Sequence, residues 1–101
     1  VALLGEELAV LEGVESAFLY GSFAARMKGL PGPAPQDIDL MVVGSPDPGA
    51  VYDACERVER LVGRPVNPTI LSAEELQRDS GFLTDLRARP VVAVLGDLPW
   101  R

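Results

Sequence analysis

A Gly-Ser pair between an apolar run and a helical segment is the feature that most constrains the fold. Residues 17–20 form the apolar run and residues 23–28 have the composition of a helix, so Gly21-Ser22 is predicted at a strand-to-helix turn. The first backbone N–H groups of a helix have no partner within it and attract anions. Gly21 lets a phosphate approach without a Cβ in its path, and the Ser22 hydroxyl adds a donor. This turn is therefore a candidate phosphate site.

A second motif, Asp37-Ile38-Asp39, opens the apolar run 38–43. Because side chains alternate between the two faces of a strand, Asp37 and Asp39 are expected on one face and Ile38 on the other. Two carboxylates held this close repel each other unless a cation lies between them. Mg²⁺ is the cation expected here, because it binds carboxylate oxygens together with water and substrate phosphates.

Strand and helix patterns alternate along the whole chain. Helices are predicted where apolar residues recur every three or four positions, at residues 4–11, 23–28, 48–62 and 82–89. A further helix is predicted to begin after Ser72, because Ser72 and Glu75 form a capping-box pattern. Strands are predicted at residues 16–20, 38–43, 65–71 and 91–95. The two prolines within 65–71 confine that strand to an edge of its sheet or to few ladder bonds. The alternation predicts an α/β domain with a small sheet covered by helices.

The helix predicted at 48–62 has the most regular pattern. Asp47 is expected as its N-cap, Pro48 as its first residue and Gly63 as the residue that closes it. The residues expected on its buried face are Val51, Ala54, Cys55, Val58, Leu61 and Val62. The pairs expected on its solvent face, each four residues apart, are Asp53 with Arg57 and Glu56 with Arg60.

The composition limits the chemistry that is open to the chain. With 101 residues, 48% of them hydrophobic and 24% charged, the chain is expected to form one globular domain over residues 1–101. The single cysteine, Cys55, excludes an intrachain disulfide and is expected to be buried rather than nucleophilic. The absence of histidine excludes histidine-based zinc sites, catalytic triads and histidine general bases.

Charge and hydropathy argue against two kinds of partner. The net charge is −6, whereas binding of nucleic acid by bulk electrostatics needs a basic surface, so this domain is not expected to bind nucleic acid directly. No apolar run approaches the roughly 20 residues needed to cross a bilayer, and no signal peptide leads the chain, so no membrane partner is expected and the cytoplasm is the expected location. An acidic chain can still bind a nucleotide through a metal ion.

Residues 21–24, Gly-Ser-Phe-Ala, followed by residues 37–43, Asp-Ile-Asp-Leu-Met-Val-Val, resemble the minimal nucleotidyltransferases of the DNA polymerase beta superfamily. Their signature is Gly-Ser, a short helix and then Asp-x-Asp on a strand. Residues 63–72 resemble a subgroup of that family often fused to a winged-helix DNA-binding domain. The resemblance implies a polymerase beta-like α/β fold with a small mixed sheet of three to four strands covered by helices.

The resemblance also implies a substrate, a cofactor and roles for four residues. The substrate is an NTP, with ATP as the expected nucleotide, and the cofactor is Mg²⁺. Gly21 and Ser22 bind the phosphates of the nucleotide, and Asp37 and Asp39 are catalytic residues that hold the metal. A hydroxyl of an acceptor then attacks the α-phosphorus in line, and pyrophosphate leaves.

Two basic residues near the Gly-Ser pair are further candidates for nucleotide binding. Arg26 and Lys28 follow Ser22 by one to two helical turns, so either can reach a triphosphate. A solvated basic face is the alternative interpretation of these two residues. Family members usually carry an arginine directly after the alanine that follows Gly-Ser-x, whereas here Ala25 holds that place and Arg26 comes one position later.

Asn67 stands where the family's third acidic residue is expected. In active members that residue lies on the next strand, binds metal and is the expected base for the attacking hydroxyl. Asn67 offers a carbonyl oxygen to Mg²⁺ but has no negative charge and accepts no proton near neutral pH. Its position before Pro68 also allows a purely structural role, because that position favours extended backbone.

Three functions remain open from the sequence. The first is an enzyme that transfers NMP to a hydroxyl, with the acceptors of the resemblance including a helical toxin partner modified by an antitoxin, and small molecules. The second is a catalytically inactive nucleotide-binding or regulatory module, antitoxin-like or linked to a winged-helix regulator, which Asn67 favours. The third is an α/β scaffold that binds no nucleotide. The sequence does not name the acceptor or the oligomeric state.

Overall fold

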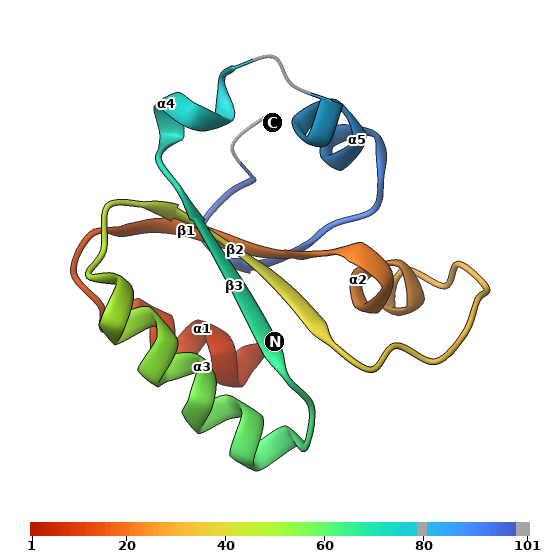
Figure 1. Cartoon of the computed structure of the whole chain (residues 1–101), viewed down its shortest axis with the longest axis horizontal. Helices are drawn as coiled ribbons and strands as arrows, with labels where there is room; N and C mark the ends of the chain where they lie inside the picture. Colours follow the sequence, from red (N-terminus) through yellow and green to blue (C-terminus); the bar gives the residue numbers. More distant parts are fainter. Residues whose placement is uncertain (79–80, 99–101) are drawn as a thin grey trace.

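The computed structural model describes residues 1–78 and 81–98 of the chain. Its elements follow in the order α1 (Ala2–Ala9), β1 (Val14–Tyr20), α2 (Gly21–Met27), β2 (Ile38–Gly44), α3 (Pro48–Val62), β3 (Val66–Leu71), α4 (Ala73–Leu76), α5 (Gly81–Ala88) and β4 (Val92–Leu95) (Figure 1). The strands form one sheet in the order β3-β2-β1-β4. β1 is antiparallel to β2 and β4, whereas β2 and β3 are parallel. The expected α/β fold, a small mixed sheet covered by helices, is confirmed.

The sheet carries a hydrophobic core on each face. Successive side chains of β1 and β2 point to opposite faces, and the side chains on both faces are apolar. Leu19 and Leu40 enter the core covered by α1 and α3, whereas Phe18 and Met41 enter the core covered by α4 and α5. Figure 1 shows these two helix pairs on opposite sides of the sheet. α2 lies at one end of the sheet, and its Ala24 is buried in the first core.

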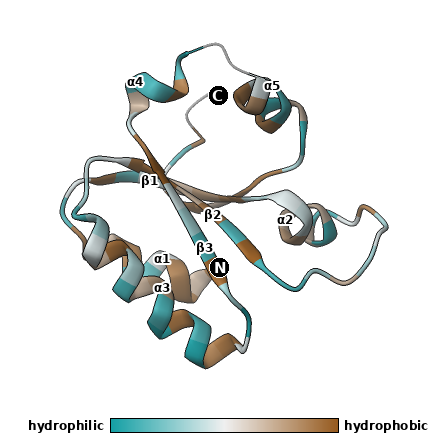
Figure 2. Cartoon of the chain, viewed as in Figure 1, coloured by the Kyte–Doolittle hydropathy of each residue, from teal (hydrophilic) through white to brown (hydrophobic). Residues whose placement is uncertain are grey.

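α3 connects the parallel strands β2 and β3, and its ends match the sequence pattern. Asp47 is its N-cap, Pro48 lies in its first turn, and Gly63 ends it in the left-handed conformation with φ +74°. Figure 2 shows bands of hydrophilic and hydrophobic residues alternating along it, as expected for a helix with one face on a sheet. The crossover through α3 is what allows β2 and β3 to run parallel.

Two details predicted for α3 are wrong. Leu61 and Val62 are 72% and 44% exposed rather than buried, because they lie in the last turn, which extends beyond α1 (Figure 1). Arg57 forms its ion pair with Glu7 of α1 rather than with Asp53. A partner on a packed neighbouring helix competes with one on the same helix, and only the tertiary structure decides between them. The predicted pair of Glu56 with Arg60 is present at 3.7 Å.

β3 lies at the edge of the sheet, where Pro68 within the strand costs least, and Pro65 precedes the strand. It is followed by a capping box in which the Ser72 hydroxyl accepts from the Glu75 N–H and the Glu75 carboxylate accepts from the Ser72 N–H. The hydrogen bond from the Ser72 backbone N–H to the carboxylate first, and the Ser72 hydroxyl second, lower the pKa of Glu75. No helix of residues 1–78 and 81–98 is long and apolar enough to span a membrane.

Cys55 on α3 provides a test of the first core through pH. Its side chain is buried, and burial first and the charge of Glu59 second raise its pKa from 9.0 to about 11. A group whose pKa is raised in the folded state contributes to the free energy of unfolding. This contribution is fully present below the unfolded-state pKa and is lost as the pH rises through the folded-state pKa. We therefore expect wild type to lose stability on the order of 1 kcal/mol relative to Cys55→Ala between pH of about 9 and about 11. Urea unfolding of both proteins across this range measures the difference, and parallel pH curves would contradict it.

Candidate functional site

The glycine of the Gly-Ser pair lies directly against the second aspartate. Tyr20, the last residue of β1, is opposite Asp39 in β2, and the chain turns at Gly21 with φ +73° to begin α2. This φ is in the left-handed region, which favours glycine. A Cβ built on Gly21 would overlap Oδ2 of Asp39. The two motifs are distant in the sequence, and the antiparallel pairing of β1 with β2 brings them together.

The parallel pairing of β2 with β3 adds Asn67 to the same end of the sheet. Asn67 is opposite Asp39 in register, and its Nδ2 donates to Oδ2 of Asp37 at 3.3 Å. Ile38 and Leu40 enter the core on the other face of the sheet, as the strand alternation predicts. Asp37 and Asn67 are exposed and Asp39 is half-buried, so ligands can reach all three side chains from solvent.

A pocket of about 300 Å³ lies beside the turn. It is lined by Gly21, Ser22, Ala25, Arg26, Leu30, Pro31, Arg89 and Pro90, and we call it the polar pocket. Figure 1 shows that α2, the loop that follows it and the segment from α5 to β4 lie at the same end of the sheet. Ser22 in the first turn of α2 is exposed, so its hydroxyl is accessible from the pocket.

The two basic residues proposed from the sequence differ in their surroundings. The guanidinium of Arg26 donates from Nε to the Pro33 carbonyl at 3.2 Å and from Nη1 to the Leu30 carbonyl. Arg26 therefore fixes the Pro- and Gly-rich loop after α2 and forms a wall of the polar pocket through it. Lys28, by contrast, is exposed at the C-terminal end of α2 and is not among the residues that line this pocket.

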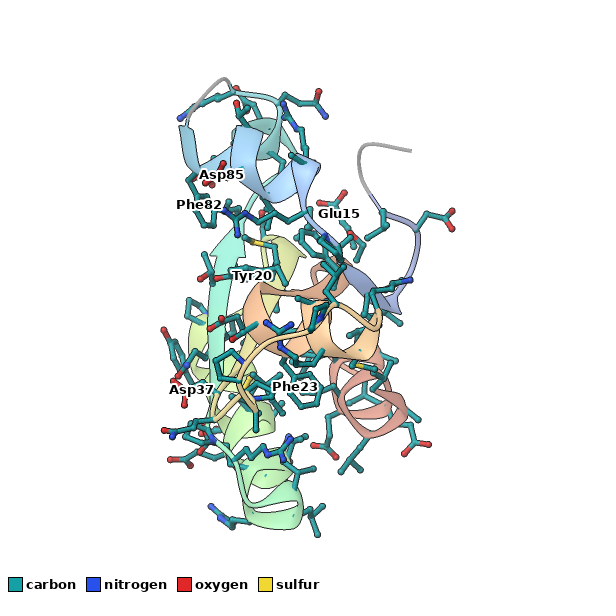
Figure 3. The ribbon with its side chains drawn as sticks, turned by 90° about the vertical axis from the view of Figure 1, so that its right-hand side faces the viewer. Glu15, Tyr20, Phe23, Asp37, Phe82 and Asp85 are labelled. Atoms are coloured by element: carbon teal, nitrogen blue, oxygen red, sulfur yellow. The ribbon has the colours of Figure 1, made fainter. Side chains whose placement is uncertain are left out.

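A second, smaller pocket of about 150 Å³ adjoins the first, and we call it the apolar pocket. It is lined by Tyr20, Gly21, Phe82, Asp85, Leu86 and Arg89. The rings of Tyr20 and Phe82 meet edge to face with centroids 6.0 Å apart, and the Tyr20 hydroxyl lies 3.3 Å from Oγ1 of Thr69. In Figure 3, Phe82 and Asp85 lie on one side of Tyr20 and Asp37 lies on the other.

Sequence reasoning missed Tyr20, Phe82 and Arg89 as residues near the site. Phe82 and Arg89 come from α5 and its end, far along the chain from the Gly-Ser pair. Nothing in their local sequence distinguishes them from the other residues of a surface helix. Only the packing of α5 over β1 brings them to Gly21.

The donor set at Asp37, Asp39 and Asn67 suits a hard divalent cation. Two carboxylates and an amide carbonyl supply the oxygen ligands that Mg²⁺ binds together with water and phosphate oxygens. Within residues 1–78 and 81–98 there is no group of three or more His, Cys, Asp or Glu side chains placed to hold a metal. Any metal here would therefore have at most two protein carboxylates, with a substrate or water as further ligands.

Comparison with known proteins identifies a similar fold but no sequence family. No protein-family model matches the chain, and no curated protein matches it. Among solved structures, a chain in the crystal structure of a toxin-antitoxin with AMP-PNP matches with a TM-score of 0.62 and 15% sequence identity. The match covers 94% of this chain and 72% of that chain. This chain therefore shares its α/β fold with a chain of a toxin-antitoxin structure that was solved with a nucleotide analogue.

Proposed function

We propose that this chain is a Mg²⁺-dependent nucleotidyltransferase that moves an NMP from an NTP, with ATP as the expected nucleotide, to a hydroxyl acceptor. The observation that carries the proposal is the contact between the Asp39 carboxylate and the Gly21 turn, with Asp37 and Asn67 beside it. The resemblance of residues 21–24 and 37–43 to minimal nucleotidyltransferases supports it. The structural neighbour, solved with AMP-PNP, is compatible with it.

Each residue of the site has a role in this reaction. Gly21 leaves room for the Asp39 carboxylate at the start of α2, and the Ser22 hydroxyl donates to a phosphate oxygen. Asp37 and Asp39 would hold Mg²⁺, which supplies positive charge to the phosphates as charge develops on them. The acceptor oxygen forms a bond to the α-phosphorus, the bond from that phosphorus to the pyrophosphate oxygen breaks, and the hydroxyl proton passes to a carboxylate or to water. Asn67 cannot take that proton, because an amide accepts none near neutral pH.

A second function, a nucleotide-binding module without turnover, is favoured by Asn67 alone. Asn67 lies opposite Asp39 and donates a hydrogen bond to Asp37, so an uncharged amide takes part in the acidic group. This hydrogen bond satisfies an oxygen of Asp37 and adds no third negative charge. A site with fewer charged ligands binds Mg²⁺ less tightly. The loss is larger for a metal ion that activates the attacking hydroxyl than for one that arrives with the nucleotide phosphates.

The acceptor we propose is a protein hydroxyl on a partner, such as a helical toxin partner. The support is the structural neighbour, which belongs to a toxin-antitoxin. If the chain acts as the module instead, the same partner would be bound and not modified.

Transfer of label from ATP to candidate acceptors tests the proposal. The protein is incubated with Mg²⁺, candidate acceptor proteins and ATP labelled either at the α- or at the γ-phosphate. Nucleotide transfer predicts that the acceptor gains α-label and no γ-label, and that pyrophosphate is released. Saturable ATP binding without transfer under any condition would support the module. The absence of both binding and transfer would contradict both functions.

Asn67→Asp is expected to separate the two functions. The substitution adds a third carboxylate opposite Asp39 and removes the amide donor to Asp37, so Mg²⁺ should bind tighter by about tenfold and transfer should accelerate. Mg²⁺ titration and label transfer measure the two effects. Asn67→Ala is the control, because it removes the same hydrogen bond and adds no charge. Equal behaviour of the two variants would show that position 67 is not a metal-ligand position.

A further inference from the structure

The polar and apolar pockets meet at the residues that line both of them. Gly21 and Arg89 belong to each pocket, so the two are neighbours that share a wall. Together their volumes of about 300 Å³ and about 150 Å³ reach the lower part of the range of about 300–1,000 Å³ typical of small-molecule sites. Their linings differ in chemistry, which suggests one ligand with two chemically different parts.

Arg89 is the cation most available to an anionic ligand of the polar pocket. The other arginine of that pocket, Arg26, already donates to two loop carbonyls. Arg89 instead has an ion pair with Asp85 at 4.0 Å, and both side chains of the pair are more than 70% exposed. An exposed pair at this distance contributes little, so Arg89 can exchange Asp85 for a ligand at small cost. Its planar guanidinium matches phosphate oxygens with two parallel hydrogen bonds.

The apolar pocket suits a flat aromatic ring. The rings of Tyr20 and Phe82 and the side chain of Leu86 line it, and charged groups enter it only from Asp85 and Arg89 among its described lining residues. Phe82 is 49% exposed although it is a large hydrophobic residue. Figure 3 shows Phe82 beside Tyr20 on the α5 side of the sheet, close to Asp85. A nucleobase stacked on Phe82 would cover this exposed surface, and any base has a face that can stack.

We propose that a nucleotide binds across Arg89, with its phosphate chain in the polar pocket and its base on Phe82 in the apolar pocket. The inference rests on the proposed function, because the two pockets meet that site at Gly21 and Ser22. It identifies Arg89 and Phe82 as binding residues for the two parts of the substrate. It also gives Asp85 a defined effect: its carboxylate competes with the phosphates for Arg89.

Two ligands separate the two halves of the site. Binding of ATP and of inorganic tripolyphosphate, each with Mg²⁺, is measured by calorimetry for wild type, Arg89→Gln and Phe82→Ala. Arg89→Gln is expected to lower the affinity for both ligands by about tenfold, because it removes a charged hydrogen-bond donor to phosphate. Phe82→Ala is expected to weaken ATP by about tenfold and to leave tripolyphosphate within about twofold, because only ATP has a base to stack. Asp85→Asn is expected to tighten both ligands by about threefold, because it removes the competing charge.

Matched controls are available on α3, outside both pockets. Arg60 forms an exposed pair with Glu56 that resembles the pair of Arg89 with Asp85, so Arg60→Gln removes an equivalent arginine. Tyr52 is 55% exposed, close to the exposure of Phe82, so Tyr52→Ala removes an equivalent aromatic ring. Both controls are expected to leave both ligands unchanged. Thermal unfolding of every variant shows whether a lost affinity reflects a damaged fold.

The outcomes distinguish this inference from the proposed function. If the variants change binding as expected but no label transfer occurs, the transferase is wrong and the binding site stands. If transfer occurs and Arg89→Gln and Phe82→Ala bind both ligands like their controls, the inference is overturned and the transferase stands. A loss of both ligands in Phe82→Ala at unchanged thermal stability would overturn the base assignment. Failure of wild type to bind either ligand would overturn the inference and the proposed function together.

Discussion

Asp39→Asn is expected to reduce nucleotide transfer by about 100-fold or more. The Asp39 carboxylate lies against Gly21, where the phosphate chain and its metal are proposed to bind, and the substitution removes its charge while it keeps its shape. Loss of one of the two carboxylates should weaken both the binding of Mg²⁺ and the stabilisation of the transition state. Initial rates of label transfer over a range of Mg²⁺ concentrations measure both effects. Excess Mg²⁺ should restore little of the rate, because a neutral amide is a poor ligand.

Asp53→Asn is the control for this substitution. Asp53 is exposed on α3, away from the Gly21 turn. Its substitution by Asn makes the same change of charge, so the transfer rate of this variant should equal that of wild type. Urea unfolding should show that both variants remain folded. A rate for Asp39→Asn within about threefold of wild type would remove the assignment of Asp39 as a catalytic residue.

Gly21→Ala is expected to lower the free energy of unfolding by about 2–3 kcal/mol and to weaken ATP binding by tenfold or more. Two causes act at this position. The φ of +73° strains any residue with a Cβ, and the new methyl group would overlap Oδ2 of Asp39. The carboxylate must then move away from the turn, which separates the two halves of the proposed phosphate site. Urea unfolding and calorimetric titration with ATP and Mg²⁺ measure the two effects.

Gly63→Ala isolates the backbone part of this cost. Gly63 has nearly the same φ, +74°, but a Cβ there meets nothing within 4 Å. Its substitution should cost only the strain of the left-handed conformation, about 1 kcal/mol, and leave ATP binding unchanged. Equal losses of stability in the two variants, with ATP binding retained in Gly21→Ala, would show that the contact with Asp39 has no functional role.

Local sequence signals predicted the elements well because each depends on neighbouring residues. The capping box of Ser72 with Glu75 and the Pro and Gly residues at the ends of α3 act within one helical turn. The alternation around Ile38 likewise needs only the geometry of one strand. Pro65 and Pro68 predicted an edge strand or a strand with few ladder bonds, because a residue without an N–H cannot complete a central ladder, and the strand lies at the edge.

Side-chain partners between elements were not predictable in the same way. Arg57 pairs with Glu7 because α1 packs beside α3. Leu61 and Val62 lie outside the core because α1 covers only part of α3. Arg26 binds the carbonyls of a loop whose path depends on its own Pro and Gly residues. In each case several partners were within reach along the chain, and packing selected one.

The sequence by itself determined which segments are strands and helices and which polar residues stand at their ends, since those properties depend on spacing and on local backbone preference. The tertiary structure decided that Asp39 touches Gly21, that Asn67 lies opposite Asp39, and that α5 brings Arg89 to the same turn. The physical reason is register and packing. Strand pairing and helix docking join residues that are distant in the chain, and they depend on the whole set of buried contacts rather than on any local pattern.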